Sequence, residues 1–237
     1  MTSRRRAAQI AGASYVALFV LGIFANFVVR EGLVESDDPA ATAANIAESQ
    51  GLFRLGLVSF IVIFALDVVV AWALYIVFRD NGRDWSLLAA WFRIVYTVFL
   101  GVAAVFMFQA LHLLSGVEFL SVFPEEQLQA QALVALELFN STWLIGLAAF
   151  GLHLLVLGLL IVKTDAAPRL LGFVMVVAGA AYVVDTLANA MLSNYADFEN
   201  LFLMMVAIPS VIGEGWFGLW LLLRAGKNEV PLLEPAE

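Results

Sequence analysis

Ionisable residues lie in the middle of three long apolar segments of this chain, each at a similar distance from a closing basic residue. Asp67 lies twelve positions before Arg79, His153 ten before Lys163, and Glu214 ten before Arg224. A charge at the centre of a bilayer costs about 2.5–3.5 kcal/mol on insertion scales, so such residues usually have a structural or functional reason to be there. These three side chains are therefore the first candidates for chemistry.

Arg93 determines the electrostatics of this set. A guanidinium is effectively always charged, so it needs at least one carboxylate beside it in an apolar environment. Asp67, on the preceding apolar segment, is the nearest candidate, and Glu214 could complete a bridging arrangement. The formal charge of these three residues and His153 is −1 with a neutral imidazole. One added proton brings it to zero, so we expect the cluster to be sensitive to pH.

Helical rise places the four residues at a similar depth. At 1.5 Å per residue, they lie about 13–18 Å from the basic ends of their segments. Asp185 lies about 25 Å in, with Tyr182 and Asn189 on the same helical face. We predict a ligand-binding set from these mid-depth positions. Its members are Asp67, Arg93, His153, Asp185 and Glu214.

Four interpretations of this set remain open. The first is a structural network that ties the helices together, although polar contacts between membrane helices average only about 0.6 kcal/mol. The second is a pocket for a lipid or small amphiphile, with Arg93 holding the head group. The third is a relay in a proton-linked carrier, and the fourth is the centre of an intramembrane enzyme. One histidine and two carboxylates can bind a divalent ion. The chain has no His-x-x-x-His or Glu-x-x-His motif, so no metal is predicted and no cofactor can be named.

Composition identifies the elements that must position these residues. The chain has 237 residues, of which 63% are hydrophobic and 14% charged, whereas a soluble domain is about half apolar and a quarter charged. Apolar runs exceed the roughly 20 residues that cross a bilayer as a helix, the plausible spanning element here. Six spans are predicted. They run from about Ala7 to Val29, Leu52 to Phe78, Trp85 to Leu114, Ser141 to Val162, Pro168 to Leu192, and Leu201 to Leu223.

The first span resembles a signal peptide in its basic start, but it is too long and lacks a small-residue cleavage site, so we expect it to be retained. The chain contains no cysteine, which excludes disulfides and thiolate metal sites. Its net charge of −8 and the lack of an extended basic patch argue against nucleic-acid binding.

Basic residues are distributed very unevenly between the two predicted surfaces. Nine lie on one side: Arg4, Arg5, Arg6, Arg79, Arg83, Lys163, Arg169, Arg224 and Lys227. Only Arg30 and Arg54 lie on the other, whose connections are acidic. This asymmetry predicts that both termini are cytoplasmic.

Two of the outer connections are themselves predicted to be helical. Asp38 precedes Pro39, which pairs a capping carboxylate with a proline suited to the first helical position. A second segment opens at Phe123-Pro124 and continues through Leu138 toward the fourth span. We expect short helices over the outer mouth of the bundle, acting either as a lid or as connectors that cover helix ends.

Several ordered motifs resemble a bacterial multi-pass membrane family known as domain of unknown function four-three-eight-six. They are the stretch from Ala41 to Gly56, Leu66-Asp67, Phe92-Arg93, Phe150 to Leu154, Pro168 to Gly172, Ala181 to Asp185, and Ile212 to Glu214. The resemblance covers about Ala7 to Leu223. It implies a bacterial inner-membrane protein of six to seven helices, and it implies no activity.

The chain is therefore predicted to be an all-α polytopic membrane bundle with six transmembrane helices. One domain covers residues 1–229, and a disordered tail covers 230–237. The predicted function is binding of a lipid or polar-headed small molecule at the buried cluster, with an intramembrane enzyme or proton-linked carrier as the alternative. Expected partners are membrane lipids and a small amphiphilic ligand, and the oligomeric state cannot be deduced.

Overall fold

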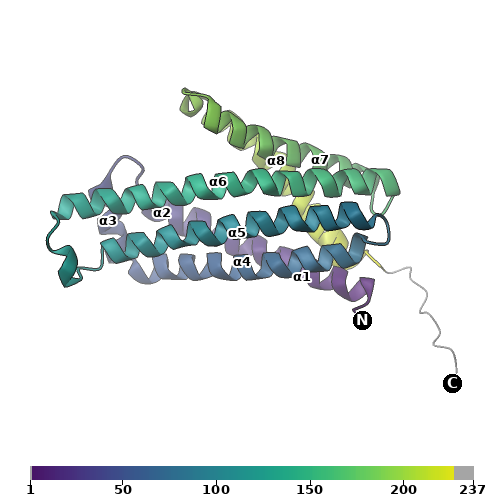
Figure 1. The fold of residues 1–237 in the computed structure, drawn as a ribbon, viewed down its shortest axis with the longest axis horizontal. Coiled ribbons are helices and arrows are strands. Elements are labelled where there is room, and N and C mark those ends of the chain that lie inside the picture. The colour runs from purple at the N-terminus through teal and green to yellow at the C-terminus, as the bar shows by residue number, and fades with distance from the viewer. Residues whose placement is uncertain (1, 227–237) are drawn as a thin grey trace, which may run out of the picture.

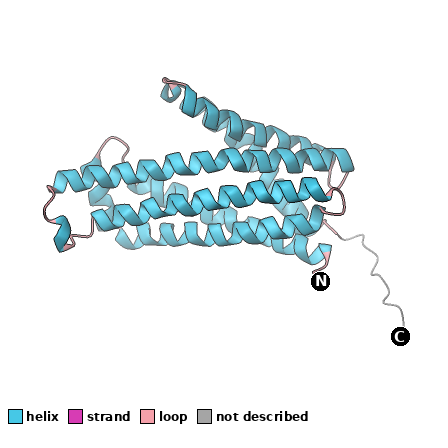
Figure 2. Cartoon of the chain, viewed as in Figure 1, coloured by secondary structure: helices cyan, strands magenta, loops and turns pink. Residues whose placement is uncertain are grey.

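A computed structural model describes residues 2–226, which form a bundle of long helices (Figures 1 and 2). Six helical stretches are long and apolar enough to cross a membrane, and no strand occurs in the described chain. They are α1–η1–α2 (Arg4–Leu33), α4 (Gln50–Phe78), α5 (Arg83–Leu113), α6 (Glu125–Thr164), α7 (Arg169–Met191) and α8 (Glu199–Leu223). The predicted all-α, multi-pass membrane fold is confirmed. The predicted tail, 230–237, lies outside the described residues.

The first span is not uniform along its length. It begins as α1 (Arg4–Ile23), widens into the π-helix η1 (Phe24–Arg30), and ends in the short α2 (Glu31–Leu33). Segments of π-helix are rare and often occur at functional sites. The sequence carries no obvious sign of this widening. The π-helical segment contains Asn26 and Arg30 and places them beside the bundle.

Local capping explains where two helices begin. The Ser3 hydroxyl accepts a hydrogen bond from the backbone N–H of Arg6 at the start of α1. Asp38 accepts one from the backbone N–H of Ala41, at 2.9 Å, at the start of α3 (Pro39–Glu48). Both satisfy N–H groups that have no partner within their own helix. The helix predicted after Asp38 is therefore present.

The second predicted outer helix is not a separate element. Residues 125–164 form one continuous helix of 40 residues, about 60 Å long at 1.5 Å per residue. No glycine or proline interrupts residues 125–140, so nothing in the chain breaks the helix at the expected start of the span. Because a bilayer core is only about 30 Å thick, α6 extends beyond it as a wall and does not lie across the mouth.

Glycines allow α6 and α7 to approach closely. A Cβ atom on Gly151 would lie 2.6 Å from the carbonyl oxygen of Gly179. A Cβ on Gly158 would lie 2.7 Å from the carbonyl oxygen of Gly172. Real Cβ atoms do not approach other atoms so closely, and small residues of this kind are typical of contacts between membrane helices.

The basic residues gather at one end of the bundle, together with the N-terminus and the turns α4–α5 and α6–α7 (Figure 1). We call this the basic end and the opposite end, which carries α3, the acidic end. Arg5 ties α1 to α8 at the basic end, because it donates to the carbonyl oxygens of Leu222 and Ala225 at 2.8 and 2.9 Å. Gly12 packs there against the backbone of Leu222.

The helices do not stay together along their whole length. The α7–α8 hairpin leans away from the rest of the bundle toward its tip, η3 (Tyr195–Phe198) (Figure 1). Gly218 of α8 still meets Tyr15 of α1, whereas a Cβ on Gly22, two turns further along α1, would meet nothing within 4 Å. This divergence leaves space between α1 and α8 on the acidic side of their contact.

Candidate functional site

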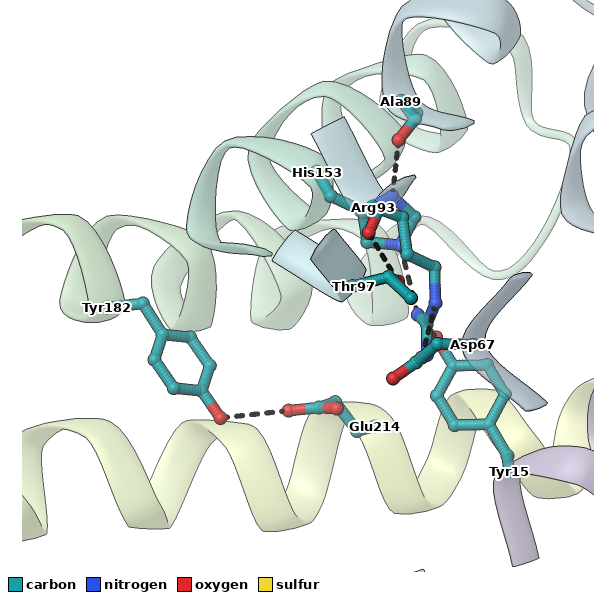
Figure 3. Close-up of polar contacts among 8 residues, drawn as sticks. All are labelled: Tyr15, Asp67, Ala89, Arg93, Thr97, His153, Tyr182 and Glu214. Carbon is teal, nitrogen blue, oxygen red and sulfur yellow. Dashed lines mark hydrogen bonds and ion pairs between the residues drawn. The ribbon is translucent and has the colours of Figure 1, made fainter. Parts of the chain in front are cut away.

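A buried ion pair joins α4 to α5 at mid-depth (Figure 3). The guanidinium of Arg93 donates to one carboxylate oxygen of Asp67 twice, through Nε at 2.9 Å and Nη2 at 2.5 Å. Both side chains are only 2% exposed. The two residues are level because they lie at similar distances from the turn that joins α4 to α5. The pairing predicted from the sequence is present.

The rest of the Arg93 guanidinium contacts other protein groups. Its Nη1 donates to the hydroxyl of Tyr15 at 2.8 Å and lies 3.4 Å from Nε2 of His153. Its Cζ lies 5.0 Å and 5.3 Å from the ring centroids of Tyr15 and Phe150, within the range of cation–π attraction. Tyr15 was missed in the sequence analysis, although counting from Arg4 places it about 17 Å in, level with the other residues.

His153 has both ring nitrogens occupied. Its Nδ1 lies 2.8 Å from the carbonyl oxygen of Ala89. A carbonyl only accepts, so Nδ1 carries the hydrogen, and Nε2 is left to accept from Arg93. The imidazole is fully buried and does not line the cavity described below. It therefore orients Arg93 and is not available to a ligand.

The described residues contain no set of side chains that could bind a metal ion. Among residues 2–226, no group of three or more His, Cys, Asp or Glu side chains could hold a metal ion. The guanidinium of Arg93 stands between the imidazole of His153 and the carboxylate of Asp67, where a cation would be repelled. The ligand geometry that a metal-dependent enzyme would need is therefore not present in the described chain.

Glu214 approaches the pair from α8 but does not bridge to it. Its Oε1 accepts a hydrogen bond from the hydroxyl of Tyr182, at 3.3 Å. No hydrogen bond or ion pair connects Glu214 to Arg93 in the described residues, so the bridging arrangement that the sequence left open is not formed here. Figure 3 shows the Glu214 carboxylate directed toward Tyr182, with the Asp67 carboxylate on its other side.

Asp185 does not join the cluster. Its Oδ1 accepts a hydrogen bond of 2.6 Å from the hydroxyl of Tyr195, near the tip of the α7–α8 hairpin. It does not line the cavity that the other residues reach. The sequence placed it on the same face as Tyr182, but only Tyr182 turns toward Glu214.

A cavity of about 510 Å³ lies above the ion pair, between α1, α8 and the core of the bundle. Its floor is polar and is formed by Tyr15, Asp67, Arg93, Tyr182, Ser210 and Glu214. Its walls are almost entirely apolar, and they include Leu18, Ile63, Leu100, Leu147, Phe150 and Val206. Its rim includes exposed apolar side chains of the first span and α8, namely Ile23, Phe27, Leu203 and Val211.

A second basic residue stands near the acidic side of the cavity. Arg30 of η1 donates to the side-chain oxygens of Asn26 and Asn140. Its Cζ lies 4.9 Å from the ring centroid of Phe139 and 5.8 Å from that of Trp143. Asn26 and Trp143 line the cavity, so this group, which the sequence analysis did not single out, borders the space opposite the floor.

Comparison with known proteins places the chain in a family. Residues 10–225 match the family described as Domain of unknown function (DUF4386). An uncharacterized protein of Archaeoglobus fulgidus is 30% identical over 171 residues, which is 72% of this chain and 84% of the relative. No solved structure matches the chain. The resemblance read from the sequence motifs is confirmed, and the protein belongs to the DUF4386 family.

Proposed function

We propose that this protein binds a lipid or another polar-headed amphiphile in the cavity between α1 and α8. The observation that carries the proposal is the combination of a polar floor at mid-depth with apolar walls. Its volume of about 510 Å³ is within the range of roughly 300–1,000 Å³ that is typical of small-molecule sites. A purely structural polar network needs no such space above it.

Polar atoms without partners support an occupant. The Ser210 hydroxyl is buried and lies close to that of Tyr182, but it has no partner of hydrogen-bonding geometry. The indole N–H of Trp143 is buried near the hydroxyl of Tyr96 and also lacks a partner of hydrogen-bonding geometry. Buried polar groups are normally hydrogen-bonded, and exceptions need an explanation such as a bound molecule. Both residues line the cavity.

The position of the rim supports entry from the lipid phase. Ile23 and Phe27 on one side and Leu203 and Val211 on the other are exposed apolar side chains. On a membrane-spanning bundle, side chains of this kind face the lipid. An amphiphile could therefore enter sideways and keep its chain in an apolar environment throughout.

No observation favours the enzyme or carrier alternatives. The basic side of the cavity is closed by tight contacts, such as those of Gly12 with Leu222 and Gly218 with Tyr15. His153 and Asp185, which a relay would use, do not line the cavity.

The test is native mass spectrometry, with lipid extraction, of protein purified in mild detergent. Ala207 lines the cavity, so Ala207→Trp should fill it and abolish a stoichiometric adduct. Ala65 is exposed on α4 and lies outside the cavity, so Ala65→Trp serves as the matched control and should retain the adduct. Equal adducts in the two variants, both folded by thermal melting, would refute the proposal.

A further inference from the structure

The guanidinium of Arg93 borders the cavity, but its hydrogen-bond donors are directed mainly at protein groups. Nε and Nη2 of Arg93 donate to Asp67, and Nη1 faces Tyr15 and His153. The rings of Tyr15 and Phe150 lie within about 5 Å of the guanidinium carbon. A guanidinium has five N–H donors and no acceptor, and most of these are already directed at protein groups. These contacts make Arg93 a residue that positions Asp67 and leave it few donors for a head group, the role that the sequence interpretation gave it.

The other charged groups at the floor are the carboxylates of Asp67 and Glu214, which only accept when ionised. Only one oxygen of Asp67 takes the hydrogen bonds from Arg93, and its other oxygen has no hydrogen-bond partner in residues 2–226. In Figure 3 this carboxylate points toward Glu214, whose Oε1 already accepts from Tyr182. Both carboxyl groups line the cavity. With Arg93 counted, the formal charge of the three groups is −1.

A third acceptor comes from an independent residue. Ser210 is 6% exposed, lies one turn before Glu214 on α8, and lines the same cavity. Its hydroxyl lies close to that of Tyr182 but has no partner of hydrogen-bonding geometry in the described chain. Two carboxylate groups and this hydroxyl, which can also donate, supply three acceptors, and a primary ammonium carries three donors.

We infer that the amphiphile bound in this cavity has a positively charged, hydrogen-bond-donating head group, of the class of a long-chain primary amine. This inference rests on the proposed function of the cavity. An ammonium group would compensate the charge of the floor and donate to the open oxygens of Asp67, Glu214 and Ser210. A carboxylate or phosphate head would meet two carboxyl groups and no uncommitted cation, and like charges brought together in a buried site are strongly unfavourable.

The test compares three probes of equal chain length: dodecylamine, 1-dodecanol and dodecanoate. Their binding constants are measured by isothermal titration calorimetry on the purified protein at neutral pH in one nonionic detergent. Dodecylamine should bind at least about tenfold more tightly than dodecanol, since hydrogen bonds to a charged group are stronger than those to a neutral one. Dodecanoate should bind most weakly.

Substitutions identify the group responsible. Glu214→Gln keeps the size of the side chain but removes its charge, and should reduce the preference for amine over alcohol by about tenfold. Glu137 is exposed on α6 and does not line the cavity, so Glu137→Gln is the matched control and should leave all three constants unchanged.

Three results would overturn the inference. One is dodecanoate binding as tightly as the amine, and a loss of that binding in Arg30→Gln would locate the anion at the opposite end. Another is an amine preference that Glu214→Gln leaves intact. The third is that no probe binds, although the native adduct is still lost in Ala207→Trp. That result would overturn the amine inference and leave the proposed function standing. Loss of the proposed function itself would instead show as equal native adducts in Ala207→Trp and Ala65→Trp.

Discussion

At the scale of single residues, the centre of this protein is a buried ion pair that borders the cavity on one side and packs against other side chains on the other. Asp67 and Arg93 are almost completely buried, and Tyr15 and His153 take up the other face of the guanidinium. Desolvation offsets most of the attraction in such a pair, so it contributes little net stability compared with a well-packed apolar pair. Removing one partner is different, because it leaves the other charge alone in an apolar environment.

Single substitutions in the pair should therefore cost far more than the double substitution. Asp67→Asn or Arg93→Met alone should destabilise the fold by about 3–5 kcal/mol, the range for one stranded buried charge. The variant with both changes should recover a large part of that loss. Thermal unfolding in detergent measures all three variants. Additive losses would mean that the two charges do not compensate one another.

At the scale of the elements, glycines determine where neighbouring helices pack closely and where they separate. Gly151 and Gly158 bring α6 against α7, and Gly12 brings α1 against α8 at the basic end. Beyond these contacts the α7–α8 hairpin leans away (Figure 1). The cavity is therefore a consequence of where close packing stops, and its polar floor lies just at that boundary.

Gly151→Ala should destabilise the protein, because the added Cβ would lie 2.6 Å from the carbonyl oxygen of Gly179. Overpacking of this kind costs about 1–3 kcal/mol. A Cβ on Gly215 of α8 would meet nothing within 4 Å, so Gly215→Ala should be neutral or slightly stabilising through its better helix propensity. Thermal melting of the two variants checks the contrast, and equal melting temperatures would contradict the packing argument.

At the scale of the whole molecule, the asymmetry of the basic residues indicates an orientation in the membrane. The basic end carries eight described Lys and Arg residues, and the acidic end carries Arg30 and Arg54. We propose that the basic end faces the cytoplasm of a bacterial-type inner membrane, following the positive-inside rule. The cavity then opens toward the outer half of the bilayer.

The absence of cysteine from the chain makes this orientation directly measurable. Val122 is 77% exposed at the acidic end, and Asp80 is exposed in the turn between α4 and α5 at the basic end. Val122→Cys should react with a membrane-impermeant maleimide in intact cells of a bacterial expression host, and Asp80→Cys only after lysis. The reverse pattern would show the opposite orientation.

The sequence by itself determined the membrane class, the number of spans and the depth of the cluster. Each span is a local property, because a bilayer requires a continuous apolar helix of sufficient length within one segment. Depth is also local, since the helical rise is constant. Counting along the chain therefore placed Asp67, Arg93, His153 and Glu214 at one level, and the structure brings the first three into direct contact.

Only the tertiary structure decided what each of these side chains does. The rotation and tilt of one helix against another are set by packing between distant segments, such as Gly151 with Gly179, and no single segment encodes them. That is why the sequence did not show that Glu214 meets Tyr182 and not Arg93, or that Asp185 turns to Tyr195. The cavity has the same origin, because it exists only where α7 and α8 lean away from their neighbours.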